Sequence, residues 1–236
     1  MDSKIRIREL KEINVNKGYL IDGFPSSGIS NAIATESMIN TSKFDLVGVI
    51  DSNNFPPISI IKNGKPNYPT RIFANEELKV SIFQSHLKIK ESLQREIAET
   101  MLEWAKKHKI ELIVSSITIK STNKTKDIFA VGNTKFAREK LKNTRFKSFE
   151  HGIIPGIPGI LLNEGKMMDQ NVIVIIVYEE DGKLHFKTSA QLCLAMSQLI
   201  PGASCDISKL QKEAEHAEQE IKETDENSRH IDSMYG

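Results

Sequence analysis

Continuous apolar runs of strand length constrain the fold of this chain most strongly. The clearest is Val-Ile-Val-Ile-Ile-Val at residues 172–177, and residues 46–50 and 110–119 are also rich in aliphatic side chains. A strand that is apolar at successive positions is buried on both faces of its sheet. These runs alternate along the chain with helical patterns. The sequence therefore predicts an α/β fold with a mostly parallel central sheet flanked by helices.

Shorter signals place the other elements. Strands are expected at residues 4–8, 18–22, 44–50, 58–61, 70–73, 78–83, 110–119 and 171–178. Helices are expected at residues 29–39, 89–108, 133–142 and 190–199. The helix at 89–108 is the clearest because its apolar residues form one stripe: Leu93, Ile97, Met101, Leu102 and Trp104. Asn63-Gly64 predicts a hairpin that joins segments 58–61 and 70–73, and residues 152–162 read as a glycine-proline loop that leads into an apolar segment.

Composition excludes several functional classes. The 236 residues are 39% hydrophobic and 27% charged, and their formal net charge is +1. A charge this small gives no reason to expect binding to nucleic acid. The basic residues between 120 and 147 are expected to form a solvated face. No apolar stretch approaches the ~20 residues that span a bilayer. We therefore expect a cytoplasmic protein with no nucleic-acid or membrane partner, in which Cys193 and Cys205 are reduced and buried.

The C-terminal part differs from the body in charge and pattern. Residues 206–236 hold nine acidic and four basic side chains. Pro201-Gly202 marks a boundary, after which apolar residues recur at spacings of three and four up to Ile221. This pattern predicts a helix that either docks on its own body or projects as a stalk or self-association seam. We expect an α/β domain at 1–200, a C-terminal helix at 201–224 and a disordered tail at 225–236.

No motif completes a catalytic or metal site. The loop Gly23–Gly28 lacks the residues of a P-loop or dinucleotide site, and it is expected to be a tight turn with serine capping the next helix. Ser26 and Ser27 do not lie in a Gly-x-Ser-x-Gly motif. His151 is a lone histidine, and the six histidines show no metal-ligand spacing. We expect no catalytic residue, metal or cofactor, although Asp22, Asp51 and Glu164 are candidates to converge at strand ends.

Three motifs in order resemble the archaeal homologues of proteasome assembly chaperones. They are Gly-Phe-Pro-Ser-Ser-Gly-Ile-Ser at 23–30, Leu-Val-Gly-Val-Ile at 46–50 and Gly-Ile-Pro-Gly-Ile-Leu-Leu at 156–162, and the resemblance covers residues 15–200. It implies a fold similar to purine nucleoside phosphorylases without enzymatic activity. One archaeal branch ends in a hydrophobic-Tyr-any motif, which corresponds here to Met234, Tyr235 and Gly236.

By this resemblance, Met234, Tyr235 and Gly236 insert into pockets between neighbouring α subunits of the proteasome core particle. Capture of a terminal carboxylate is a known mode of recognition. The expected function is that of an ATP-independent assembly chaperone or activator of the archaeal proteasome, which binds as a homo-oligomer. The alternative is an enzyme with a phosphorylase-like fold that acts on a small anionic or nucleoside-like ligand at the Gly23–Gly28 loop.

Overall fold

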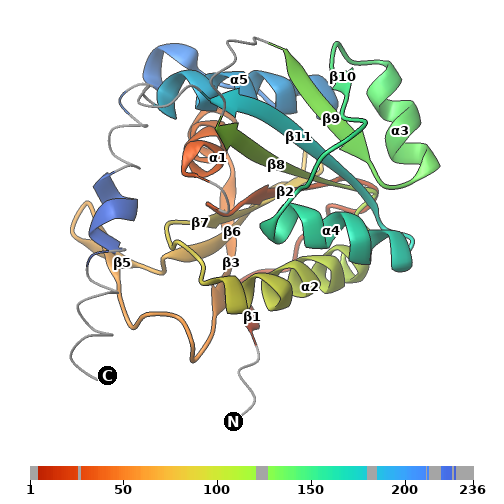
Figure 1. Cartoon of the computed structure of the whole chain (residues 1–236). Coiled ribbons are helices and arrows are strands. Elements are labelled where there is room, and N and C mark those ends of the chain that lie inside the picture. Colours follow the sequence, from red (N-terminus) through yellow and green to blue (C-terminus); the bar gives the residue numbers. More distant parts are fainter. Residues whose placement is uncertain are drawn as a thin grey trace.

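A mixed sheet forms the centre of the molecule (Figure 1). The computed structural model describes residues 5–25, 28–120, 127–179, 185–210, 212, 219–224 and 226. The helices are α1 (Ser30–Thr41), α2 (Glu91–Lys107), α3 (Lys135–Lys142), α4 (Gly156–Met167) and α5 (His185–Leu199). The strands are β1 (Arg6–Glu9), β2 (Tyr19–Gly23), β3 (Asp45–Asp51), β4 (Ile60–Lys62), β5 (Lys65–Asn67), β6 (Thr70–Asn75), β7 (Val80–Ser85), β8 (Leu112–Lys120), β9 (Ile128–Gly132), β10 (Lys147–Ser148) and β11 (Asn171–Glu179).

The strand order of the large sheet is β1-β3-β6-β7-β2-β8-β11-β9-β10. Its centre, β7-β2-β8-β11, is parallel, as predicted. The flanking pairs β1–β3, β3–β6, β6–β7 and β9–β11 are antiparallel, so the sheet as a whole is mixed. The short connection between β6 and β7 explains one of these pairs, because adjacent strands joined by a tight turn run antiparallel. Asn75 supports that turn by accepting a 2.9 Å hydrogen bond from the Leu78 amide.

Helices cover both faces of this sheet. Helices α2 and α4 lie on one face, and α1 and α5 lie on the other (Figure 1). Strand β11 shows why its sequence is apolar throughout: Val174 and Ile176 pack toward the α2 side, whereas Ile173 and Ile175 pack toward the α5 side. Within the described part of the chain, every helix is too short or too polar to cross a bilayer.

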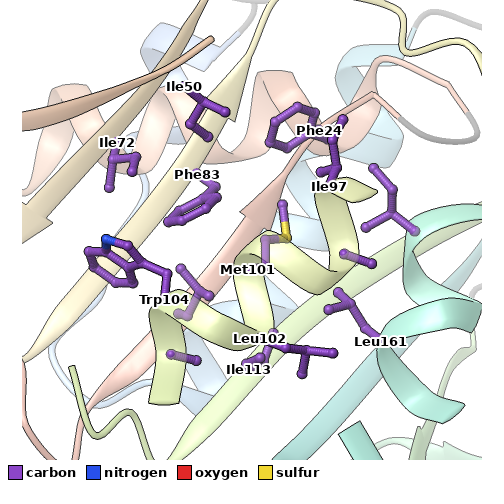
Figure 2. Packing of buried hydrophobic residues seen from close by; sticks show 14 of the residues in the cluster. Phe24, Ile50, Ile72, Phe83, Ile97, Met101, Leu102, Trp104, Ile113 and Leu161 are labelled. Atoms are coloured by element: carbon purple, nitrogen blue, oxygen red, sulfur yellow. The ribbon is translucent and has the colours of Figure 1, made fainter. Parts of the chain in front are cut away.

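The predicted stripe of α2 is buried against the sheet. Figure 2 shows Ile97, Met101 and Trp104 of this helix pointing into the cluster that contains Phe83. The rings of Phe83 and Trp104 meet edge to face with their centroids 5.3 Å apart. The amphipathic pattern of residues 89–108 therefore located both the helix and its buried face.

Two local predictions need correction. The hairpin turn lies at Asn63-Gly64, where both residues have positive φ, but β4 pairs with β5 rather than with segment 70–73. A two-residue turn joins the residues that directly flank it, here Lys62 and Lys65, and segment 70–73 instead lies in β6 between β3 and β7. The segment 152–162, which was expected to begin as a glycine-proline loop, is helical from Gly156, where α4 begins.

The cysteines also differ from expectation. Cys193 of α5 is joined to Cys205 in a disulfide, with the Cα atoms 6.2 Å apart, so the prediction of two reduced thiols is wrong. The chain reverses after α5 through the turn at Gly202, which has a φ of +80°. This reversal returns the following segment to the helix it has just left and brings the two cysteines, 12 positions apart, within bridging distance.

Candidate functional site

A buried polar network lies at the end of β2, beside the Gly23–Gly28 loop that is the ligand site in the enzyme alternative. Asp22 is fully buried and accepts hydrogen bonds from the Ser115 hydroxyl at 2.7 Å and the Phe24 amide at 3.0 Å. Burial is the largest influence on this carboxyl, and it raises the pKa of Asp22 to about 6.

Asn31 ties the described part of the Gly23–Gly28 loop to the sheet. Its amide nitrogen donates to the carbonyls of Asp22 and Phe24 at 2.6 and 3.3 Å, and its oxygen accepts from Ser116 at 2.8 Å. The polar groups of Asp22 and Asn31 are thus used to hold the protein together. A hydrogen-bonded network of this kind fixes the loop and rigidifies the core.

The start of α1 differs from the predicted serine cap. The N-cap residue is Ile29, and it makes no side-chain capping hydrogen bond. Ser26 and Ser27 lie outside the described residues. Since Asn31 binds the loop carbonyls from within the first turn of the helix, the strand-to-helix connection is secured without a serine cap.

The three candidate carboxylates do not meet at one site. Asp22 is buried in the β2 network, Asp51 pairs with Arg8 at 3.1 Å, and Glu164 lies on α4. Glu164 pairs with Arg95 of α2 at 2.7 Å. His151 is exposed. These candidate carboxylates therefore do not converge.

The predicted docking residues Met234, Tyr235 and Gly236 lie outside the described residues, as does all of 227–236. The described residues that precede them are held on the body. Residues 207–210 and 219–224 are helical, and Leu210, Ile221 and Thr224 are 0%, 6% and 5% exposed. The C-terminal helix was expected either to dock on the body or to project from it, and these residues are docked.

Asp206 fixes the start of this segment. Its side chain accepts hydrogen bonds from the amides of Ser208 at 3.0 Å and Lys209 at 3.3 Å, which caps the helical turn that follows. Its own amide donates to the Thr41 hydroxyl at the end of α1 at 3.2 Å. The segment therefore leaves the body from a defined point.

A second, partly buried cluster lies at the far end of the segment, and we name it the Glu220 cluster. It unites charged and polar side chains from α1, β4, β6, the residue after β7 and the C-terminal segment: Glu36, Lys62, Arg71, His86 and Glu220. In Figure 1 the short blue helix that carries Glu220 lies beside the β4–β5 hairpin. Five positions that are scattered over 185 residues of sequence thus meet at one place.

His86 is the centre of the Glu220 cluster and is 1% exposed. Its Nε2 lies 3.2 Å from a guanidinium nitrogen of Arg71, and its Nδ1 lies 2.8 Å from Glu220 Oε2. Nε2 also lies 3.4 Å from Glu36 Oε2, so the imidazole lies between two carboxylates and beside a guanidinium group.

Charge balance stabilises this partly buried cluster. Lys62 Nζ lies 2.8 Å from Glu36 and 3.8 Å from Glu220, so two cations and two carboxylates face one another around the imidazole of His86. Burial alone would raise the pKa of Glu220, but the His86 contact and the charges of Lys62 and Arg71 outweigh it and lower this pKa. Burial tends to lower the pKa of Lys62, yet the neighbouring carboxylates raise it.

The ligand atoms of Glu36, His86 and Glu220 lie within 4.8 Å of one another, a separation that also suits a metal ion. The chemistry of the surroundings does not. Lys62 and Arg71 already neutralise both carboxylates, and a divalent cation would face two positive side chains. The arrangement is that of a buried ion-pair network.

Sequence reasoning missed the Glu220 cluster. Its members come from five separate segments, and no motif or spacing relates them. One partial signal existed, since Glu220 directly precedes Ile221, the last residue of the apolar pattern in the C-terminal helix.

Comparison with known proteins adds the context of a family. The profile of the PAC2 family matches residues 20–225. A protein of Methanocaldococcus jannaschii described as uncharacterized is 24% identical over 223 residues, which cover 94% of this chain and 92% of that relative.

Solved structures share the fold. Pyrococcus furiosus PbaA, described as an archaeal homologue of proteasome-assembly chaperone, superposes with a TM-score of 0.81 at 23% identity and covers 96% of this chain and 99% of its own. Pyrococcus furiosus PbaB, described as an archaeal proteasome activator, superposes with a TM-score of 0.74 at 16% identity. The match covers 94% of this chain and 99% of the PbaB chain. At these identities the match establishes a common fold.

Proposed function

Because this chain belongs to the PAC2 family, we propose that it is an ATP-independent partner of the proteasome core particle and acts as an assembly chaperone or activator. The descriptions of the similar PbaA and PbaB structures support a proteasome-related role. The sequence contains no Gly-Lys-Ser/Thr ending of a P-loop, which agrees with independence from ATP.

The observation that carries the docking proposal is the anchored C-terminal segment. Burial of Ile221 and Thr224 and the contact of Glu220 with His86 hold the segment on the body, and ten residues follow Glu226. In the proposal Met234 and Tyr235 fill pockets between neighbouring α subunits of the core particle, and the carboxylate of Gly236 pairs with a cation there.

A single tail of this kind binds weakly. Burial of the Met234 and Tyr235 side chains contributes about 2 kcal/mol each, and ordering the tail offsets several kcal/mol. Several tails on one homo-oligomer would raise the avidity by a factor of about 10² to 10⁴. The proposal therefore includes self-association of the chain.

The test is co-sedimentation with archaeal proteasome core particles. Deletion of residues 234–236 and the Tyr235→Ala variant are expected to abolish binding, while Ser233→Ala, a matched change just before the motif, leaves it intact. Circular dichroism and thermal melting verify that each variant retains the fold of the full chain. Unchanged binding after the deletion would refute docking through the terminus.

We further propose that the chain is not an enzyme. The hydrogen bonds of Asp22 and Asn31 support this, because they tie both buried side chains to Ser115, Ser116 and the neighbouring backbone. A ligand that binds the folded state raises the melting temperature by mass action. Phosphate and nucleosides are therefore expected to leave the melting temperature unchanged, and a specific, saturable rise with one of them would favour the enzyme alternative.

A further inference from the structure

We propose that Glu220 is the anchoring carboxylate of the C-terminal segment, and that loss of its contacts moves the last anchored position among the described residues from Thr224 back to Leu210. The inference rests on the proposed function in one respect, namely that the chain length released from the body serves docking of the C-terminus. The anchoring itself follows from the contacts of the Glu220 cluster.

The body residues of the cluster form a site for one carboxylate. Without Glu220, the formal charges of Lys62, Arg71 and Glu36 leave a net charge of +1 around His86. Arg71 is 9% exposed and His86 is 1% exposed, whereas the side chain of Lys62 is 43% exposed, so solvent screens part of this charge. A partly buried charge without a partner destabilises the structure. Glu220 supplies the missing charge and places Oε2 2.8 Å from Nδ1 of His86.

Other contacts of the far end of the segment are few. Ile221 and Thr224 are the other buried residues described at 219–226, and Lys222, Glu223 and Glu226 are exposed. One buried isoleucine and one buried threonine stabilise a packed helix weakly in comparison with a whole apolar face. The carboxylate contact therefore makes a large contribution to closure, and its removal opens this end without disturbing the core strands.

Opening changes how far the terminus can reach. Twelve residues follow Thr224, and an extended chain of that length spans at most about 43 Å. Twenty-six residues follow Leu210, which corresponds to at most about 94 Å. Because effective concentration depends on the match between tether length and the distance to be spanned, the state of the Glu220 cluster would adjust multivalent docking to a partner.

Hydrogen exchange of the full-length protein tests the anchor without any partner. Glu220→Gln keeps the size of the side chain and removes its charge, and Glu223→Gln makes the same change at an exposed position of the same helical turn. The amides of residues 221–224 are expected to exchange at least about tenfold faster in Glu220→Gln than in the wild type. Glu223→Gln is expected to match the wild type, and the amides of β8 and β11 should retain their protection in all three proteins.

Equal exchange at residues 221–224 in the Glu220→Gln and Glu223→Gln variants would overturn the inference, whether both rates rise or neither does. The outcome does not depend on the proteasome. If deletion of residues 234–236 leaves proteasome binding intact, the docking proposal fails while the exchange result stands. If Glu220→Gln leaves exchange unaltered, the anchor fails while docking through the terminus is still open to its own test.

Discussion

The Asp22→Asn variant tests the physical account of the buried strand-end network. Asp22 has no exposed surface, and its pKa is raised from an ordinary value of 3.8 to about 6, chiefly by burial. This change is equivalent to about 3 kcal/mol. The hydrogen bonds from Ser115 and Phe24 favour the ionised form but do not offset its loss of hydration.

The sign follows from linkage between protonation and folding. A carboxyl whose pKa is higher in the folded state binds its proton more tightly when folded, so its contribution to stability is present below pH 3.8 and is lost as the pH rises through about 6. In the wild type, Asp22 therefore lowers the free energy of unfolding by up to about 3 kcal/mol between these limits. Asparagine does not titrate, and the Ser115 hydroxyl can turn to accept from its amide group.

Urea denaturation at a series of pH values from about 4 to about 7 measures this effect. The stability of Asp22→Asn minus that of the wild type is expected to increase by about 2 to 3 kcal/mol over the series. Other groups titrate in both proteins and cancel in the difference. Asp45→Asn removes a carboxylate whose side chain is 72% exposed and serves as the matched control. A difference that is constant with pH, or that falls as the pH rises, would refute the account of Asp22.

Three further changes test the core packing, the cap of α3 and the disulfide. Met101→Ala removes a fully buried side chain from α2 and is expected to lower the free energy of unfolding by about 2 to 5 kcal/mol in urea denaturation. Thr134→Ala removes the hydroxyl that accepts a hydrogen bond from Ala137 at the start of α3 and is expected to cost about 1 kcal/mol, with faster amide exchange confined to that helix. Reduction of the disulfide between Cys193 and Cys205 is expected to cost about 3 kcal/mol, and a Cys193→Ser/Cys205→Ser variant should show no further change in stability with reductant.

The sequence predicted elements whose signal is local. The runs at 172–177 and 110–119 became the central strands β11 and β8, and the apolar stripe of 89–108 became the buried face of α2. The turn at Asn63-Gly64 was located correctly because positive φ at two successive residues is a local requirement that few residue types satisfy.

What the sequence did not predict depends on contacts between distant segments. The pairing of β1 with β3 and of β9 with β11 joins segments that are far apart in the sequence. The disulfide depends on the reversal of the chain at Gly202. The meeting of Glu220 with His86 depends on the path of the whole C-terminal segment, which no spacing of charges in the sequence encodes.

The two buried polar clusters of this molecule differ in how their polar groups are satisfied. The Asp22 network is completed by neighbouring strands and by α1, so all its members stay together as long as the body is folded. The Glu220 cluster is completed by a side chain from outside the α/β body, so the body alone carries an uncompensated charge at that place. A polar network whose members all belong to the α/β body stabilises a single folded arrangement. A network that needs a side chain from the C-terminal segment makes the stability of the body depend on where that segment lies. If the chain regulates how its terminus is presented, the physical means to do so lie in the Glu220 cluster and not in the glycine-rich loop that first suggested a site.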